Sequence, residues 1–214
     1  MTRIALITGG NRGIGRAAAD ALANDDTDII VTYRSNADEA KAVVAELAEH
    51  GRTALALRLD LADHESFAAF ATELRAALRE QWSRESFDIL VNNAGFDGLT
   101  PFGQADAATI DALYAVHVRG PILLTELLAP MISGGGRVMF TSTGLTRYVA
   151  NPAYSAYAAM KGAIEVYTKY AAKALGARAI TVNALAPGAS ATDFGGGMIR
   201  DDDTYRAVAA TTSA

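Results

Sequence analysis

The 214-residue sequence contains no cysteine, only five prolines, and no run of like charge longer than Asp201-Asp202-Asp203. The lack of cysteine excludes disulfides, thiolate nucleophiles and cysteine-based zinc sites, and it fits a reducing compartment. A net charge of -5 argues against a general nucleic-acid binder, which would carry a basic stripe. Apolar runs are too short for a membrane span, and Met1 to Thr8 leaves no room for a signal peptide. We therefore expect a cytoplasmic protein with no membrane or nucleic-acid partner.

Half of the residues are apolar, which is ample material for one core. Short apolar runs alternate with longer stretches of helical composition. The expected strands cover Ile4–Ile7, Ile29–Tyr33, Ala54–Leu59, Ile89–Val91, Arg137–Thr141 and Ile180–Ala184. The expected helices cover Ile14–Ala23, Ala37–Glu49, Ser66–Leu78, Ala107–Ile132 and Ser155–Leu175. This alternation predicts right-handed βαβ units and a doubly wound parallel sheet with Rossmann topology, in one α/β domain over residues 1–214.

The segment from Thr8 to Gly15, TGGNRGIG, joins the first expected strand to the first expected helix. Glycines at this place let the backbone approach a pyrophosphate, while the helix N-terminus supplies N–H donors. The alternative is a tight glycine turn that binds nothing. We expect nucleotide binding, with contacts from Gly9, Asn11, Arg12, Gly13, Ile14 and Gly15.

The end of the second strand indicates which dinucleotide is bound. A carboxylate there would bind the ribose 2′-OH, whereas an arginine accommodates a 2′-phosphate. The chain has Tyr33, Arg34 and Ser35, with no acid before Asp38, and Arg12 adds a second cation. This pattern predicts NADP(H) in preference to NAD(H). The alternative is that Arg34 is an ordinary surface residue.

Tyr157 and Lys161 are four residues apart, so on a helix they share one face. A free phenol has a pKa of about 10, and a cation held beside it favours the phenolate and lowers that value. The pair is therefore a candidate general acid and base. A half-buried tyrosine beside a solvated lysine is the alternative, and the spacing alone does not decide between them.

Together these motifs resemble the short-chain dehydrogenase/reductase family from Arg3 to about Phe194. The further matching pieces are Asp60-Leu61, Asn92-Asn93-Ala94-Gly95, Asn183 and Pro187-Gly188. The resemblance implies that Asp60, with Leu61 beside it, contacts the adenine and that Asn93, Ala94 and Gly95 border the cofactor. It also implies that Pro187, Gly188 and Thr192 contact the nicotinamide end. From the residues alone, Asp60 could instead cap a helix and Asn92-Asn93 could form a turn.

The resemblance implies hydride transfer between a nicotinamide and a carbonyl or alcohol carbon, with Tyr157 exchanging the proton. Lys161 lowers the phenol pKa and binds the nicotinamide ribose, and a hydroxyl after the fifth strand polarises the substrate oxygen. The family's serine lies thirteen residues before the tyrosine, where this chain has Gly144. Ser142 and Thr143 are the nearest hydroxyls. We narrowly favour Ser142, because the threonine methyl group would crowd the substrate.

His117 stands where the family usually has an asparagine that holds a water on the lysine's proton-relay route. A histidine can donate, accept and titrate near neutral pH, so it either joins the relay or fills space in the helix. His50 and His64 are not in metal-ligand spacing, and no metal is expected.

The leading interpretation is an NADPH-dependent carbonyl reductase or alcohol dehydrogenase. A non-catalytic NADP(H)-binding sensor or scaffold is the alternative. The small-molecule substrate is not readable from the sequence, although four aromatic residues suggest an apolar pocket: Phe96, Phe102, Tyr148 and Phe194.

Family members normally continue with a further helix and a seventh strand, so we expect that the sequence is truncated at Ala214. Gly195 to Gly197 is a candidate hinge ahead of a lid helix. Family members often form subunit contacts through the missing region. We therefore expect a homodimer or homotetramer if that region is present.

Overall fold

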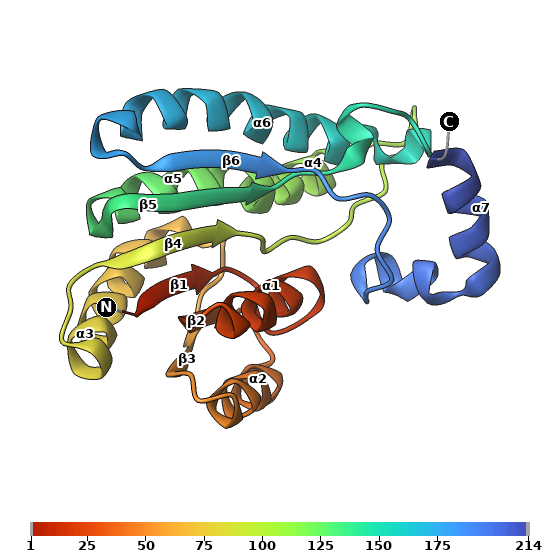
Figure 1. The fold of residues 1–214 in the computed structure, drawn as a ribbon. Coiled ribbons are helices and arrows are strands. Elements are labelled where there is room, and N and C mark those ends of the chain that lie inside the picture. Colours follow the sequence, from red (N-terminus) through yellow and green to blue (C-terminus); the bar gives the residue numbers. More distant parts are fainter. Residues whose placement is uncertain (1, 213–214) are drawn as a thin grey trace.

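The computed structural model describes residues 2–212, which form a parallel sheet flanked by helices (Figure 1). The strands are β1 (Arg3–Ile7), β2 (Thr27–Tyr33), β3 (Ala54–Arg58), β4 (Phe87–Asn92), β5 (Ile132–Thr141) and β6 (Thr181–Leu185). The helices are α1 (Gly13–Asn24), α2 (Ala37–Glu49), α3 (Phe67–Trp82), α4 (Ala107–Tyr114), α5 (Gly120–Leu128), α6 (Ser155–Leu175) and α7 (Asp202–Thr212). Shorter helical segments are η1 (His64–Ser66), η2 (Ala115–Arg119), η3 (Ala129–Met131), η4 (Gly144–Thr146), η5 (Pro152–Tyr154), η6 (Gly176–Arg178) and η7 (Phe194–Arg200). The predicted doubly wound α/β fold is confirmed.

Alternate residues of the strands enter two separate cores, one on each face of the sheet. On one face Leu6 and Leu90 pack with Leu74 of α3 and Ile164 of α6. On the other face the neighbouring positions, such as Ile7, pack with residues of α1 and α2. Successive side chains of a strand point to opposite faces, so a strand covered on both sides must be apolar throughout. This explains the continuous apolar runs of β1 and β2.

The strand order β3-β2-β1-β4-β5-β6 places the first and fourth strands side by side at the centre. The chain winds outward from β1 in one direction and from β4 in the other, so a crevice opens between their carboxyl ends. Ligands of doubly wound proteins bind at this switch point. The loops that follow β1, β2, β4 and β5 therefore form the edge where a site is expected. In Figure 1, α7 stands beyond the same edge.

The predicted helix Ala107–Ile132 is helical up to Met131, but it is irregular: α4 passes through the π-helical turn η2 into α5 and the 3₁₀ turn η3. Pro121 has no N–H, so the carbonyl of His117, four residues earlier, lacks its usual helical donor. The N–H of Gly120 bonds five residues back to Ala115, which is the π-helical pattern. This π-helical turn includes His117, which lines a cavity at the carboxyl edge of the sheet.

The segment Ala107–Met131 is also the one helical stretch among the described residues that is long and apolar enough to cross a membrane. Half of its most apolar window is buried within the domain. A core helix of a folded domain passes the same criterion, so this finding is weak support for a membrane span. By length and composition, this segment is an exception to the expectation that every apolar run is too short for a membrane span.

Several predicted bounds also differ from the structure; for example, α3 ends at Trp82 rather than Leu78. Strand β5 begins at Ile132 rather than Arg137, because the glycine turn Gly134-Gly135-Gly136 is taken up in the strand as an irregularity opposite β4. The candidate hinge Gly195–Gly197 adopts left-handed backbone angles at all three glycines, and α7 follows it. The predicted terminus at Ala214 lies outside the described residues.

Candidate active site

A cavity of about 700 Å³ lies at the carboxyl ends of the strands, and the separate sequence motifs meet in its wall. Of the predicted site residues, the lining includes Gly9, Asn11, Arg12, Gly13, Ile14, Tyr33, Arg34, Ser35, Asp60, Leu61, Asn93, Ala94, Gly95, His117, Ser142, Thr143, Tyr157, Lys161, Pro187, Gly188 and Thr192. These residues come from loops far apart in the sequence, and the parallel sheet brings them to one edge. The volume suits a sizeable organic ligand.

The glycine-rich loop has the backbone of a cradle. Gly9 has φ +63°, and a Cβ there would lie 2.9 Å from the Cα of Ala94. Gly13 also has a left-handed φ, of +56°. Gly15 does not line the cavity. A Cβ at that position would collide with the carbonyl of Gly9, so this glycine serves close packing beneath the loop.

The N-terminus of α1 has no side-chain cap, because Arg12 at the N-cap position makes no capping hydrogen bond. Its first N–H groups therefore remain available to an anionic ligand. Asn93 holds the loop from behind, since its Nδ2 donates to the carbonyls of Thr8 (3.1 Å) and Gly9 (3.3 Å). Asn92 points away from the cavity and donates to Thr125 at 3.0 Å. The two asparagines thus have different structural roles.

Arg12 and Arg34 line the same end of the cavity. Neither side chain takes part in an ion pair within residues 2–212. Two uncompensated guanidinium groups favour a phosphate or another anion there. Asp60 lines the cavity and accepts from the N–H of Ala62 at 2.9 Å in a local turn. It does not cap a helix, because Asp63 is at the N-cap position of η1 and Ser66 at that of α3.

Glu39, which the sequence reading did not select, also lines this end of the cavity. Its Oε2 accepts a 2.5 Å hydrogen bond from Nδ2 of Asn11. The contact joins the glycine-rich loop to α2 across 28 residues. The helix periodicity of α2 could have placed Glu39 one turn beyond Ser35, but only the packing of α2 beside α1 shows that it reaches the loop.

Tyr157 and Lys161 both lie on α6 and are almost fully buried, with 6% and 5% of their surface exposed. Burial raises the pKa of Tyr157 to about 12, against the opposing effect of a hydrogen bond from Thr143. Burial lowers the pKa of Lys161 to about 8. The lysine Nζ donates to the carbonyl of Thr141 at 2.7 Å and lies 5.7 Å from the centroid of the tyrosine ring.

The expected lowering of the phenol pKa by Lys161 is therefore not found in the isolated chain. Desolvation of the phenolate is the largest effect on this pKa, and the ammonium group of Lys161 is directed at a backbone carbonyl. In this arrangement Tyr157 is a protonated phenol at neutral pH. Such a group is suited to donate a proton.

Ser142 and Thr143 point to different partners. The Ser142 hydroxyl donates to Glu165 Oε1 at 2.6 Å, whereas the Thr143 hydroxyl lies near enough to the Tyr157 phenol to lower its pKa. Thr143 has an extended backbone, with φ -155° and ψ 150°, so its side chain alternates with that of Ser142. The contact of Ser142 with Glu165 favours Thr143 as the hydroxyl that acts with Tyr157, and the catalytic role of either residue stays a prediction.

His117 is buried beside the tyrosine, with ring centroids 5.2 Å apart in an edge-to-face arrangement. Its Nε2 lies 2.8 Å from the carbonyl oxygen of Phe96, and its Nδ1 has no hydrogen-bond partner in the described part of the chain. Burial, together with the charge of Lys161, lowers its pKa to about 3. The expected titration near neutral pH is therefore wrong, and the imidazole stays neutral.

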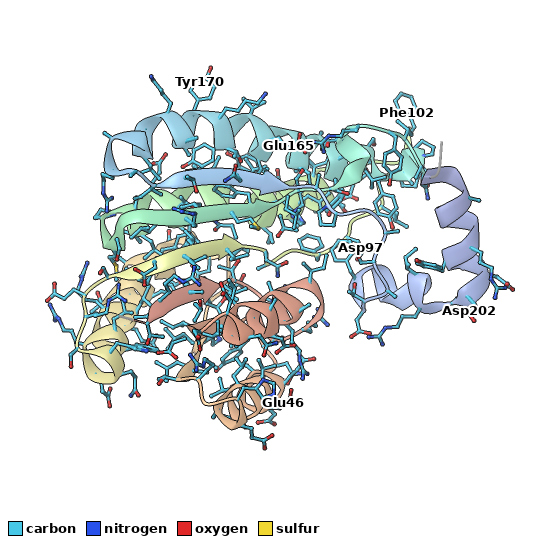
Figure 2. All side chains as sticks on the ribbon, viewed as in Figure 1. Glu46, Asp97, Phe102, Glu165, Tyr170 and Asp202 are labelled. Carbon is cyan, nitrogen blue, oxygen red and sulfur yellow. The ribbon has the colours of Figure 1, made fainter. Side chains whose placement is uncertain are left out.

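Aromatic residues surround the outer part of the cavity. Phe96, Tyr148, Tyr154 and Phe194 line it, and the ring of Phe194 lies 5.9 Å from that of Tyr157. Phe102 does not line the cavity within the described chain. It is 96% exposed and projects from the outer edge of the molecule (Figure 2). Its predicted place in the pocket is not supported, because the segment Pro101–Gly103 runs along the surface.

Within residues 2–212, no group of three His, Cys, Asp or Glu side chains is placed to hold a metal ion. The cavity instead combines an anion-binding end with a phenol, a hydroxyl and an ammonium group at the other. This arrangement can bind a phosphorylated ligand and exchange a proton with a group beside Tyr157.

The chain is similar to known proteins over nearly its whole length. A family model described as short chain dehydrogenase matches residues 3–203. A 3-oxoacyl-[acyl-carrier-protein] reductase of Synechocystis sp. is 33% identical over 194 residues, which cover 90% of this chain and 76% of the relative. A versicolorin reductase of Emericella nidulans is 31% identical over 195 residues, covering 90% and 70%.

Solved structures give the same picture. A short chain dehydrogenase from Burkholderia cenocepacia in complex with NADP has a TM-score of 0.86 at 35% identity, covering 95% of this chain and 80% of its own. The angucycline C-6 ketoreductase LanV with bound NADP has a TM-score of 0.91 at 30% identity, covering 99% and 81%.

Proposed function

Because this chain belongs to the short-chain dehydrogenase family of oxidoreductases, we propose that it is an NADPH-dependent reductase of carbonyl compounds. The observation that carries the proposal is a single cavity that joins the glycine-rich loop, Arg12 and Arg34 to Thr143, Tyr157 and Lys161. A dinucleotide needs the first end of such a cavity, and proton exchange with a carbonyl oxygen needs the second.

The residues present fit NADP(H). The bare glycine loop and the uncapped N-terminus of α1 suit the pyrophosphate, and Arg12 with Arg34 suit a 2′-phosphate. Solved relatives with bound NADP support the same cofactor. When bound, NADPH supplies the hydride, and we assign the remaining chemistry to side chains of this chain.

In this proposal Tyr157 donates the proton to the carbonyl oxygen that is being reduced. Its raised pKa keeps the phenol protonated at neutral pH, so the proton is present when it is needed. Thr143 donates a hydrogen bond to the same oxygen and stabilises the charge that develops on it. Both groups are nearly buried, so water competes little with these contacts.

Lys161 supplies positive charge beneath the phenol and returns the lost proton. Its pKa of about 8 leaves the ammonium charged at neutral pH while keeping its proton transferable. We assign His117 a place on this route as a neutral acceptor, because its buried Nδ1 has no partner in the described chain. If the assignment is right, His117→Asn retains most turnover, and His117→Leu loses about tenfold or more in kcat. Equal rates in the two variants would refute it.

We infer an apolar, ring-containing ketone as the substrate class. Phe96, Tyr148 and Phe194 form an aromatic wall beside Tyr157, and such a wall favours flat apolar rings. Among the relatives, a versicolorin reductase and an angucycline C-6 ketoreductase support the same class. Small aliphatic ketones would leave most of this wall without contacts.

The test is NADPH oxidation with a panel of ketones, aldehydes and quinones, using the wild type and Tyr157→Phe. We expect turnover of polycyclic or aromatic ketones by the wild type. The variant should lose about 10²- to 10⁴-fold in kcat and keep its NADPH affinity. NADPH binding by the wild type without turnover of any compound would favour the non-catalytic sensor. Retained turnover in Tyr157→Phe would count against the phenol as the proton donor.

A further inference from the structure

Three consecutive residues at the end of β5 contact three residues spaced one turn apart on α6. The carbonyl of Thr141 accepts from Lys161, the hydroxyl of Ser142 donates to Glu165, and the Thr143 hydroxyl lies near enough to the Tyr157 phenol to lower its pKa. Because Tyr157, Lys161 and Glu165 recur every four residues, they lie along one face of the helix. The end of β5 therefore faces α6 at three successive residues. The proposed reaction uses Tyr157 and Lys161 but not Glu165.

The third point, Glu165, gathers donors from a longer segment. Its Oε1 accepts from Ser142 Oγ at 2.6 Å and from Thr146 Oγ1 at 2.9 Å, with Arg147 Nη1 at 3.5 Å. Figure 2 places Glu165 on α6 beside the segment that follows β5. A single carboxylate oxygen therefore ties together Ser142 to Arg147, which includes Thr143. Hydrogen bonds to a carboxylate are stronger than those between neutral groups.

The bond to Ser142 carries most of this attachment. Ser142 is only 2% exposed, so its hydroxyl would be left buried and unpaired without the carboxylate. The side chain of Arg147 is 61% exposed, so this ion pair adds little. Burial raises the pKa of Glu165, but hydrogen bonds from Ser142 and Thr146 and the charges of Arg147 and Lys169 together outweigh burial and lower the pKa overall. The carboxylate is therefore ionised at neutral pH and acts only as an acceptor.

We propose that Glu165 is a positioning residue that holds the Ser142–Arg147 segment so that the Thr143 hydroxyl faces the Tyr157 phenol. The proposal rests on the reductase function proposed above. Glu165 is not among the described residues that line the cavity, so it acts through Ser142 and not on the substrate. Thr143 directly follows Ser142, so fixing Ser142 also fixes the backbone from which the Thr143 side chain projects.

The backbone at this place does not replace the carboxylate. The N–H groups of Ser142 and Gly144 donate to Leu185 (2.6 Å) and Pro187 (2.8 Å), which keeps the strand end paired with the β6 side. Beyond Gly144, the backbone N–H groups of the η4 turn make only local bonds, such as Arg147 N to Gly144 O at 2.9 Å. Loss of the Glu165 contacts would leave β5 in place and loosen the turn that directly follows Thr143.

The test compares Glu165→Ala with Glu165→Gln, whose amide oxygen can still accept from Ser142. Glu126→Ala is the matched control, because that carboxylate also faces a hydroxyl of α6, Tyr167 at 3.5 Å, but lies outside the loop. We expect kcat to fall about tenfold in Glu165→Ala, because small displacements of reacting groups have effects of this order. NADPH affinity should change by less than about twofold, and Glu165→Gln should recover to within about threefold of the wild type.

A double-mutant cycle with Ser142→Ala measures whether the two residues act as one unit. Ser142→Ala removes the same hydrogen bond from the loop side, so it also serves if Glu165→Ala does not fold. The variant with both changes should be no slower than Glu165→Ala, because the contact can be lost only once. Additive losses in kcat would refute coupling through this hydrogen bond.

Amide hydrogen exchange provides a readout that does not depend on turnover. Glu165→Ala should speed exchange at Thr146 and Arg147 and leave the amides of α6 unchanged, whereas Glu126→Ala should change neither. If the wild type reduces no carbonyl compound, the proposed function fails while exchange still tests the attachment. An unchanged kcat in an active Glu165→Ala, an equal loss in Glu165→Gln, or unchanged exchange of the segment would overturn the proposal.

Discussion

The Nζ of Lys161 donates to the carbonyl oxygen of Thr141 at 2.7 Å, while the ring of Tyr157 lies 5.7 Å away. The ammonium is therefore held by the end of β5, and the phenol is held by burial and by Thr143. The two groups have pKa values shifted in opposite directions, to about 8 for the lysine and about 12 for the tyrosine. Lys161 and Tyr157 therefore lose their protons in different pH ranges.

For the free enzyme we expect kcat/KM for NADPH to fall as the pH rises through about 8. Below that value Lys161 is charged, and above it the ammonium loses its proton, while Tyr157 stays protonated until about pH 12. The measurement is the pH profile of the wild type beside Lys161→Arg. An arginine stays charged above pH 12, so its alkaline limb should move upward even if the rate is lower. A wild-type profile that is flat through pH 9 would contradict this assignment.

Thr143→Val keeps the shape of the side chain and removes its hydroxyl. We expect kcat to fall by about 10²-fold, as when one donor to a developing oxyanion is deleted. Ser142→Ala should cost about tenfold or less, because that hydroxyl faces Glu165. Steady-state kinetics of the two variants with one ketone give the comparison. The reverse order of effects would restore Ser142 as the catalytic hydroxyl.

Arg34→Asp replaces a free guanidinium at the cofactor end of the cavity with a carboxylate. The ratio of kcat/KM for NADPH to that for NADH should fall by about ten- to a hundredfold, because a charge-assisted phosphate contact is lost and repulsion replaces it. Arg79→Ala is the control, since Arg79 pairs with Glu85 on the exposed side of α3. An unchanged ratio in Arg34→Asp would assign Arg34 to the ordinary surface.

Asp88 supports the fold at the other end of the sheet. Its carboxylate accepts from the N–H of Ile4 at 2.8 Å and pairs with Arg84 at 2.9 Å. Burial raises its pKa, but the bonds from Arg84 and Ile4 outweigh burial and lower it overall. Asp88→Ala should reduce the free energy of unfolding by about 1–3 kcal/mol near neutral pH.

The pH dependence of this stabilisation has a defined sign. Because the folded-state pKa is lowered, the stabilisation is complete above the unfolded-state value of about 4 and is lost as the pH falls through the folded-state value. Denaturant unfolding of the wild type and the variant at several pH values measures it. Equal differences in stability at pH 7 and well below the folded-state pKa would show that the carboxylate's charge contributes nothing.

The alternation of strands and helices could be predicted from the sequence, because the spacing of apolar residues indicates which faces of a strand or helix are buried. Continuous apolar runs predicted strands covered on both faces, and both cores are present. The π-helical turn at His117 was missed, although Pro121 is a local signal for an irregular helix. Glu165 was also missed, and its place four residues beyond Lys161 was a readable signal.

The sequence by itself determined the fold class, the glycine-rich loop and the residues that could carry charge or a proton, because these follow from local pattern and residue chemistry. Tertiary structure alone decided that Thr143 rather than Ser142 faces Tyr157, that Phe102 lies outside the cavity, and that Glu165 attaches the turn to α6. It also decided the directions of the pKa shifts. The physical reason is that side-chain direction, burial and distance between charges depend on segments far apart in the chain, which meet only when the sheet has formed.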